Sequence, residues 1–140
     1  MTPVLPGFAG FVPDAFTRLY PKAEVKKLHW NLEPPYDGVL QLQPTEKIFK
    51  VIGGKFVAKM MEMFFFKGGR GSDNVSSHGA PMNDTGGYIY NVDTYNEMRP
   101  SSGDPKYLAD SASAVLAGLQ AGDPDAVWMM QGWLFLGTFE

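Results

Sequence analysis

The fold of this 140-residue chain is decided by the stretch Gly87-Tyr88-Ile89-Tyr90-Asn91-Val92-Asp93-Thr94-Tyr95-Asn96-Glu97. Its first six residues are rich in β-branched and aromatic side chains, which predicts a strand. A loop over 99–103 and a helix that opens at Asp104 follow. A carboxylate at the C-terminal end of a strand in such a β–loop–α unit is placed where α/β barrels keep their catalytic groups. A strand-end acid that caps a turn or faces water gives the same local pattern, so both interpretations stay open at this point.

The segment after this stretch predicts a helix and then another strand. Asp104 as N-cap and Pro105 as first residue predict the helix, and Gly122 followed by Asp123-Pro124 predicts its end. Its apolar residues recur at helical spacing and give it one face for a sheet: Leu108, Ala112, Val115, Leu116 and Leu119. The apolar run Ala126–Leu136 predicts a strand that is buried on both faces, as in a parallel sheet.

The first half of the chain predicts shorter elements before one long helix. They are a short buried strand near 2–5, a helix over 14–20 that Pro13 opens, a weak strand or loop over 24–30, a polar, Pro-rich connection over 31–44, and a helix from Glu46 to about Phe66 with Thr45 as N-cap. In the long helix, an i, i+4 stripe is expected to face the core: Ile48, Ile52, Phe56, Met60 and Phe64. Gly53-Gly54 predicts a close packing point or a kink. The resulting order of strand, helix, strand, helix, strand indicates an α/β protein.

Composition excludes several classes of protein. A hydrophobic content of 44% and an aromatic content of 14% argue against disorder, and a net charge of −3 offers no basic stripe for nucleic acid. No apolar run approaches the roughly 20 residues that span a bilayer, and the N-terminus does not resemble a signal peptide. The long Gly/Ser/Asn-rich loop over 67–87 contains Gly68-Gly69-Arg70-Gly71-Ser72, but it lacks the strand and the Gly-Lys-Ser/Thr of a phosphate-binding loop. His29 and His78 have no partner at metal-ligand spacing, so we expect neither a metal nor a cofactor.

Three blocks of the sequence resemble, in order and spacing, the α-N-acetylglucosaminidases of glycoside hydrolase family 89. The blocks are 2–15 (Thr-Pro-Val-Leu-Pro-Gly-Phe-Ala-Gly-Phe-Val-Pro-Asp-Ala), 93–98 (Asp-Thr-Tyr-Asn-Glu-Met) and 126–135 (Ala-Val-Trp-Met-Met-Gln-Gly-Trp-Leu-Phe). The segments 49–64 and 105–121 match as well, so the resemblance covers nearly the whole chain. It implies a (β/α)8 TIM barrel between smaller domains, of which this chain would form about three parallel strands with their helices.

The resemblance also implies an activity and a set of site residues. The family removes terminal α-linked N-acetylglucosamine from glycosaminoglycans such as heparan sulfate, with net retention, in a lysosomal or secretory compartment. Glu97 matches the family's acid/base and Asn96 its neighbouring amide. Trp133 matches the tryptophan at the sugar, and Trp30 matches a further pocket aromatic. The expected partner is therefore a carbohydrate with a terminal N-acetylglucosamine, and not a nucleic acid or a membrane.

A retaining glycosidase needs a second carboxyl group about 5–5.5 Å from the acid/base. Asp93 lies four residues before Glu97, which is about 13 Å along an extended strand and too far for this role. In the family the nucleophile comes from a later barrel strand, and no residue here matches it. Met1 falls inside the family's barrel, and three strands are fewer than the eight of a closed barrel of typically about 250 residues.

We therefore expect residues 1–140 to be a fragment of the catalytic barrel domain, which carries the acid/base without the nucleophile and is inactive alone. The remaining barrel strands of a longer chain would be its partner. The alternative is a catalytically inactive remnant that binds carbohydrate or a partner chain. A third hypothesis, an independent small α/β binding domain, is less favoured because open strand edges tend to pair or aggregate.

Overall fold

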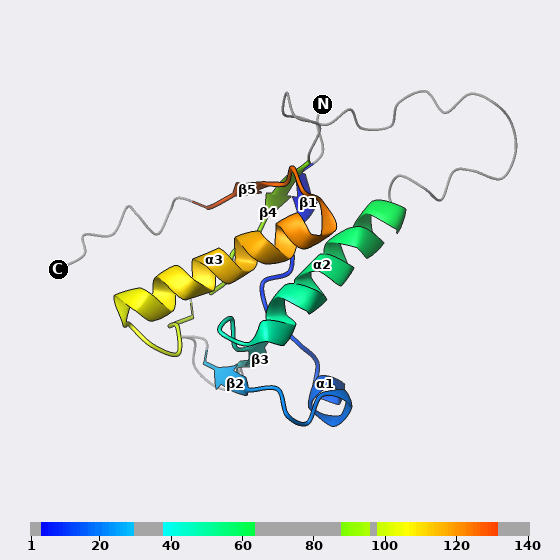
Figure 1. Cartoon of the computed structure of the whole chain (residues 1–140). Coiled ribbons are helices and arrows are strands. Elements are labelled where there is room, and N and C mark those ends of the chain that lie inside the picture. The colour runs from blue at the N-terminus through cyan, green and yellow to red at the C-terminus, as the bar shows by residue number, and fades with distance from the viewer. Residues whose placement is uncertain (1–3, 30–37, 64–87, 96–97, 132–140) are drawn as a thin grey trace, which may run out of the picture.

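The computed structural model describes residues 4–29, 38–63, 88–95 and 98–131 (Figure 1). Within these ranges the elements are β1 (Val4–Pro6), α1 (Ala15–Leu19), β2 (Val25–Leu28), β3 (Val39–Leu42), α2 (Lys47–Met61), β4 (Ile89–Asn91), α3 (Pro105–Gly122) and β5 (Val127–Met129). None of the helices in this described part is both long and apolar enough to cross a lipid bilayer. The long loop predicted over 67–87 lies outside the described residues.

Three parallel strands form the main sheet, in the order β1-β4-β5. Leu5, Tyr90 and Trp128 stand side by side in its register. The chain passes from β1 to β4 through α2 and from β4 to β5 through α3. These crossovers confirm the predicted α/β class and the three parallel strands, because parallel strands need such connections.

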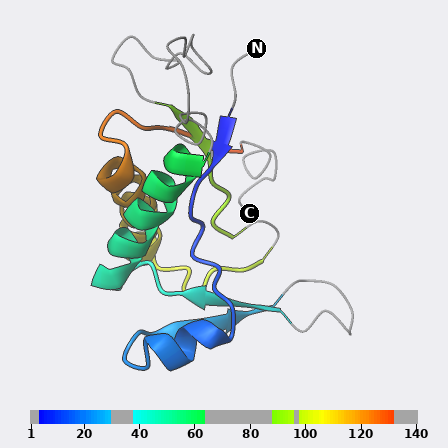
Figure 2. The same ribbon diagram turned by 90° about the vertical axis from the view of Figure 1, so that its right-hand side faces the viewer.

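Both long helices pack on the same side of this sheet, as Figure 2 shows. Leu5 and Tyr90 point to that side and are buried, whereas the alternate residues Val4, Val127 and Met129 are 40–42% exposed. The prediction that 126–136 is buried on both faces is therefore wrong for the described part of β5. The physical reason is that β5 is an edge strand, and in the described structure its second face has no layer packed on it.

The two helices meet through glycines. A Cβ added to Gly53 would lie 3.0 Å from the Gly118 Cα, and one added to Gly122 would lie 2.6 Å from the Gly54 carbonyl oxygen. The glycine pair 53–54 is thus the close packing point that the sequence predicts. Because both glycines approach α3 closely, the buried face of α2 consists of Phe49, Gly53, Gly54 and Val57. The predicted stripe lies beside this face, with Ile48, Ile52, Phe56 and Met60 only half-buried, and Phe64 lies outside the described residues.

The ends of the helices differ from the prediction at two of three N-termini. Helix α3 begins as predicted, with the Asp104 carboxylate accepting hydrogen bonds from the backbone N–H of Lys106 at 2.7 Å and of Tyr107 at 3.4 Å. Helix α1 begins at Ala15, so Pro13 lies before it. Helix α2 begins at Lys47, and its N-cap residue is Glu46, which has an extended backbone, in place of the predicted Thr45.

The connection predicted over 31–44 is wrong for its last part, because Val39–Leu42 is a strand. It pairs antiparallel with β2, from Val25 opposite Leu42 to Leu28 opposite Val39. Gly38 has a φ of +87°, and a Cβ there would overlap the Leu28 carbonyl, so this position requires glycine. Backbone hydrogen bonds from Val12 to Leu40 and from Leu42 to Gly10 hold the hairpin beyond the C-terminal end of β1 (Figure 2).

Candidate functional site

The C-terminal edge of the parallel sheet is where the chain gathers polar side chains. The segments that leave this edge are Gly7–Val12 after β1, Val92–Tyr95 after β4 and Met130–Gln131 after β5. In sheets of this kind, ligands bind at the carboxyl ends of the strands, where loops from several strands converge. The β2–β3 hairpin lies at the same edge and adds a further wall.

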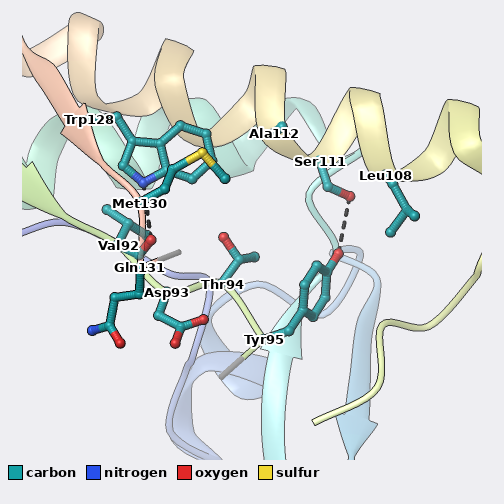
Figure 3. Close-up of a pocket in the computed structure, with 10 residues that line it drawn as sticks. All are labelled: Val92, Asp93, Thr94, Tyr95, Leu108, Ser111, Ala112, Trp128, Met130 and Gln131. Atoms are coloured by element: carbon teal, nitrogen blue, oxygen red, sulfur yellow. Dashed lines mark hydrogen bonds between the residues drawn. The ribbon is translucent and has the colours of Figure 1, made fainter. Parts of the chain in front are cut away.

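A cavity of about 170 Å³ opens at this edge, between the loop after β4, the first half of α3 and the end of β5 (Figure 3). Its lining residues are Val92, Asp93, Thr94, Tyr95, Leu108, Ser111, Ala112, Trp128, Met130 and Gln131. The wall is mainly apolar, and Figure 3 shows the Asp93 carboxylate and the Gln131 amide on the side away from Ser111. Pockets for whole small ligands have volumes of about 300–1,000 Å³. This cavity therefore has room for only part of such a ligand.

Trp128 joins the ends of two strands. Its indole Nε1–H donates to the Val92 carbonyl oxygen at 3.0 Å, and the ring lines the cavity (Figure 3). Val92 itself is buried. The bond fixes the first residue of the loop after β4 against β5, so the path of this loop is set where it leaves the sheet.

Gln41 on β3 holds the same loop from the other side. It is fully buried, and its Nε2 donates to the Thr94 carbonyl at 2.9 Å and to the Ala9 carbonyl at 3.3 Å. One side chain thereby fastens the loops after β1 and β4 together. Its Oε1 is buried and finds no hydrogen-bond partner among the described residues. Buried acceptors without a partner are rare in folded proteins. This oxygen is therefore a buried acceptor at the C-terminal edge of the sheet that can still take a hydrogen bond.

Tyr95 anchors the far end of the loop to α3 through a chain of hydrogen bonds. Its hydroxyl donates to Ser111 Oγ at 3.2 Å, and Ser111 Oγ donates to the Tyr107 carbonyl at 2.8 Å (Figure 3). The Tyr107 hydroxyl donates to Gln43 Oε1 at 3.0 Å, and Gln43 Nε2 donates to Ser101 Oγ at 3.4 Å. Burial raises the pKa of Tyr95 above its ordinary value, which keeps the phenol neutral and able to donate.

The four residues that the sequence predicts for the site, Glu97, Asn96, Trp133 and Trp30, lie outside the described residues, so their roles stay predictions. The described structure does fix the neighbours of the Asn-Glu pair. Tyr95 is held as above, and Met98 is buried and donates its backbone N–H to the Tyr95 carbonyl at 2.8 Å. Both neighbours belong to the C-terminal edge of the sheet.

The residues that hold this loop were not predicted from the sequence. Gln41 and Gln43 alternate with Leu40 and Leu42, which is the period of a strand, but the composition of 31–44 favours a Pro-rich connection. Tyr107 and Ser111 are four residues apart on a helix that was predicted, so their common face was available as a signal.

Comparison with known proteins indicates the same kind of fold as the structure does. Residues 1–139 match the family described as "Alpha-N-acetylglucosaminidase (NAGLU) tim-barrel domain". Human α-N-acetylglucosaminidase is 40% identical over 139 residues, which cover 96% of this chain and 16% of the human protein. The chain thus spans about a sixth of the length of this relative, as the 16% coverage shows. It belongs to the α-N-acetylglucosaminidase family, and its three parallel strands with their two crossover helices are part of the family's TIM barrel.

Proposed function

We propose that this chain supplies the acid/base half of the active site of a retaining exo-α-N-acetylglucosaminidase, with Glu97 as the acid/base. One observation carries the proposal. The residues on either side of Asn96-Glu97, which are Tyr95 and Met98, are fixed at the C-terminal edge of a parallel sheet in a chain of this family. Barrel enzymes carry their catalytic groups at this edge.

In the proposed reaction, Glu97 gives its proton to the oxygen of the glycosidic bond as that bond breaks. It then takes a proton from the water that releases the sugar from the nucleophile. Such an acid must start protonated, which an apolar environment favours because burial disfavours the carboxylate. Val92 and Met98, which are near Glu97 in sequence, are buried, and the phenol of the preceding Tyr95 is neutral.

The remaining roles follow the family resemblance. Asn96 would hydrogen-bond the substituent at C2 of the sugar, Trp133 would stack on a sugar face, and Trp30 would form a further wall. Strand β4 ends at Asn91, so Asp93 is not on an extended strand and the spacing of about 13 Å to Glu97 does not apply. The family resemblance implies a nucleophile on a later barrel strand, so we propose that a segment outside these residues supplies it.

One face of the sheet has no described residues packed on it, which supports this view of the chain as one part of a larger site. Val4, Val127 and Met129 are exposed on the side opposite the helices. In a closed barrel this face points to the interior, where side chains from all strands pack. We infer that the rest of the barrel packs on it, and that the natural substrate is a glycosaminoglycan processed in the lysosomal or secretory compartment implied by the family.

A chimera tests the function. Residues 1–139 replace the aligned segment of the human enzyme, and release of p-nitrophenol from the α-N-acetylglucosaminide and of sugar from a natural disaccharide is measured. We expect the chimera to hydrolyse both substrates and the 140-residue chain alone to hydrolyse neither. Glu97→Gln should lower the rate on the disaccharide by about 10²–10⁴-fold, the usual contribution of a general acid.

Asp110→Asn is the matched control, because Asp110 is a carboxylate on α3 that pairs with the exposed Lys106. A chimera in which Glu97→Gln is as active as Asp110→Asn would remove Glu97 from the acid role. Hydrolysis by the isolated 140-residue chain would contradict the division of the site between two segments.

A further inference from the structure

A second hollow lies at the same edge of the sheet, between β2 and the loop that leads into α3. It is a groove of about 480 Å³, lined by Lys26, Lys27, Leu28, His29, Arg99, Pro100 and Ser101. Three cationic residues and a histidine therefore line one groove, and none of the described residues that line it is an aspartate or a glutamate. The whole chain has 15 acidic and 12 basic residues, so this concentration of positive charge runs against its net charge of −3.

Both walls of the groove are held in place by contacts within the fold. Leu28 is buried and paired with Val39, which fixes β2 as one wall. Ser101, on the other wall, accepts a hydrogen bond from the buried Gln43 at 3.4 Å. Glu24 pairs with Lys26 at 3.2 Å, but both side chains are about half exposed, at 53% and 48%. An exposed pair of this kind is weak, so Lys26 can exchange it for a ligand anion.

Position relates the groove to the proposed acid/base. Arg99 is two residues after Glu97 and belongs to the same loop after β4. A volume of about 480 Å³ is within the range of small-ligand sites, about 300–1,000 Å³, whereas the cavity of about 170 Å³ beside Tyr95 is below it. The groove therefore has room for a second part of the ligand, next to the part that would lie at the loop after β4.

We propose that this groove is an anion-binding subsite for the sugar that follows the terminal N-acetylglucosamine of the substrate. It holds a sulfate or carboxylate group of that sugar through Arg99, Lys27 and Lys26. Arginine offers paired N–H donors that match the oxygens of such groups, and lysine offers a point charge. The inference rests on the proposed function, because it names the chemistry of the substrate on the far side of the scissile bond.

The test measures binding of three oligosaccharides with a terminal α-linked N-acetylglucosamine, by titration calorimetry with the 140-residue chain and as KM in the chimera. The first oligosaccharide is uncharged, the second carries a uronate in the following position, and the third carries a uronate and a sulfate. We expect affinity to rise in this order and to fall with added salt, because salt screens exposed charges. The order separates the two sources of negative charge.

Arg99→Gln and Lys27→Gln should each weaken binding of the charged oligosaccharides by about two- to fivefold, as for exposed charge pairs. They should leave the uncharged oligosaccharide unchanged. Arg99→Lys, which keeps the charge, should restore most of the loss. The matched control is Lys55→Gln, because Lys55 is an exposed lysine on α2 and does not line the groove.

Equal affinity for the three oligosaccharides overturns the inference and leaves the proposed function standing. A loss with Lys55→Gln as large as with Arg99→Gln also overturns it, because the attraction is then general. Equal binding of a sulfated oligosaccharide without terminal N-acetylglucosamine supports the anion site and contradicts the proposed function. Absence of binding and of activity for every oligosaccharide, in both the chain and the chimera, contradicts both.

Discussion

The two ends of the parallel sheet differ in their hydrogen bonds and in the space beside them. At the N-terminal end, the buried Asp123 carboxylate accepts hydrogen bonds from the Tyr90 hydroxyl at 3.0 Å, the Tyr88 N–H at 2.9 Å and the Asp125 N–H at 3.2 Å. At the C-terminal end, Gln41 and Trp128 donate to backbone carbonyls of a loop, and hollows remain beside it. The hydrogen-bond cluster around Asp123 at the first end joins α3 and β5 to β4. The hydrogen bonds at the second end hold a loop in place and leave room for a ligand.

The difference agrees with a general property of barrel folds. In barrel folds the N-terminal face of the strands serves stability and the C-terminal face carries the chemistry. Asp123 has three donors on its two oxygens, so little capacity remains for a ligand. Gln41 Oε1 has no partner in the described structure, so capacity remains there. Substitutions at the two ends should therefore separate into stability effects and activity effects.

The largest stability effect is expected for Asp123→Ala. It removes the acceptor of three donors at a buried position, so we expect the free energy of unfolding to fall by about 3 kcal/mol. Urea denaturation of the chain, followed by circular dichroism, measures this loss. Asp14→Ala is the control, because Asp14 is exposed and makes no side-chain cap of α1. Equal denaturation midpoints for the two variants would mean that the hydrogen-bond cluster around Asp123 does not stabilise the fold.

Tyr90→Phe should have a smaller effect with a distinct pH dependence. Burial, and then the hydrogen bond to Asp123, raises the pKa of Tyr90 above its ordinary value. The folded pKa exceeds that of the unfolded chain, so this contribution is complete below about pH 10 and is lost as the pH rises through the folded pKa.

The wild-type chain should therefore lose stability steeply above about pH 10, and Tyr90→Phe should flatten this fall. At neutral pH the variant should be about 1 kcal/mol less stable, the usual worth of one hydrogen bond. Denaturation midpoints across the alkaline range measure both effects. Parallel curves for the wild type and the variant would show that Tyr90 is not the group that titrates.

Tyr95→Phe should have the smallest effect on stability and a larger one on activity. Its hydroxyl makes one hydrogen bond at 3.2 Å to Ser111, so we expect a loss below about 1 kcal/mol. The same bond anchors the loop next to Asn96-Glu97, so kcat of the chimera should fall several-fold with little change in the denaturation midpoint. A stability loss equal to that of Asp123→Ala, with kcat unchanged, would erase the distinction between the two ends.

Local chemistry in the sequence predicted most of the scaffold. Asp104-Pro105 marks the start of α3, and Gly53-Gly54 marks the contact between the helices, because few other arrangements suit these residues. The β3 strand was not predicted, because it lies next to a Pro-rich segment and is stabilised by pairing with β2 and with the chain after β1. The buried face of α2 was predicted one residue off, because the partner glycines on α3 decide which ridge approaches closest.

The candidate site could be predicted only in part. The family blocks point to Glu97, Asn96, Trp133 and Trp30, and these residues lie outside the described ranges. Among the supporting residues, Gln43 and Tyr107 contact each other only in the folded chain, because 64 residues separate them in sequence. No local pattern encodes such a pairing, which depends on the tertiary fold.

The glycine contact between α2 and α3 has a consequence for inherited or engineered variation in this family. Gly118 lies six to seven residues along α3 from Ser111 and Ala112, which is about 10 Å at 1.5 Å per residue. A methyl group at Gly53 would lie 3.0 Å from the Gly118 Cα, so the backbone of α3 would have to shift by a few tenths of an ångström. A missense change that touches no sugar could thus misalign the cavity wall at a distance, and a screen restricted to ligand-contacting positions would overlook it.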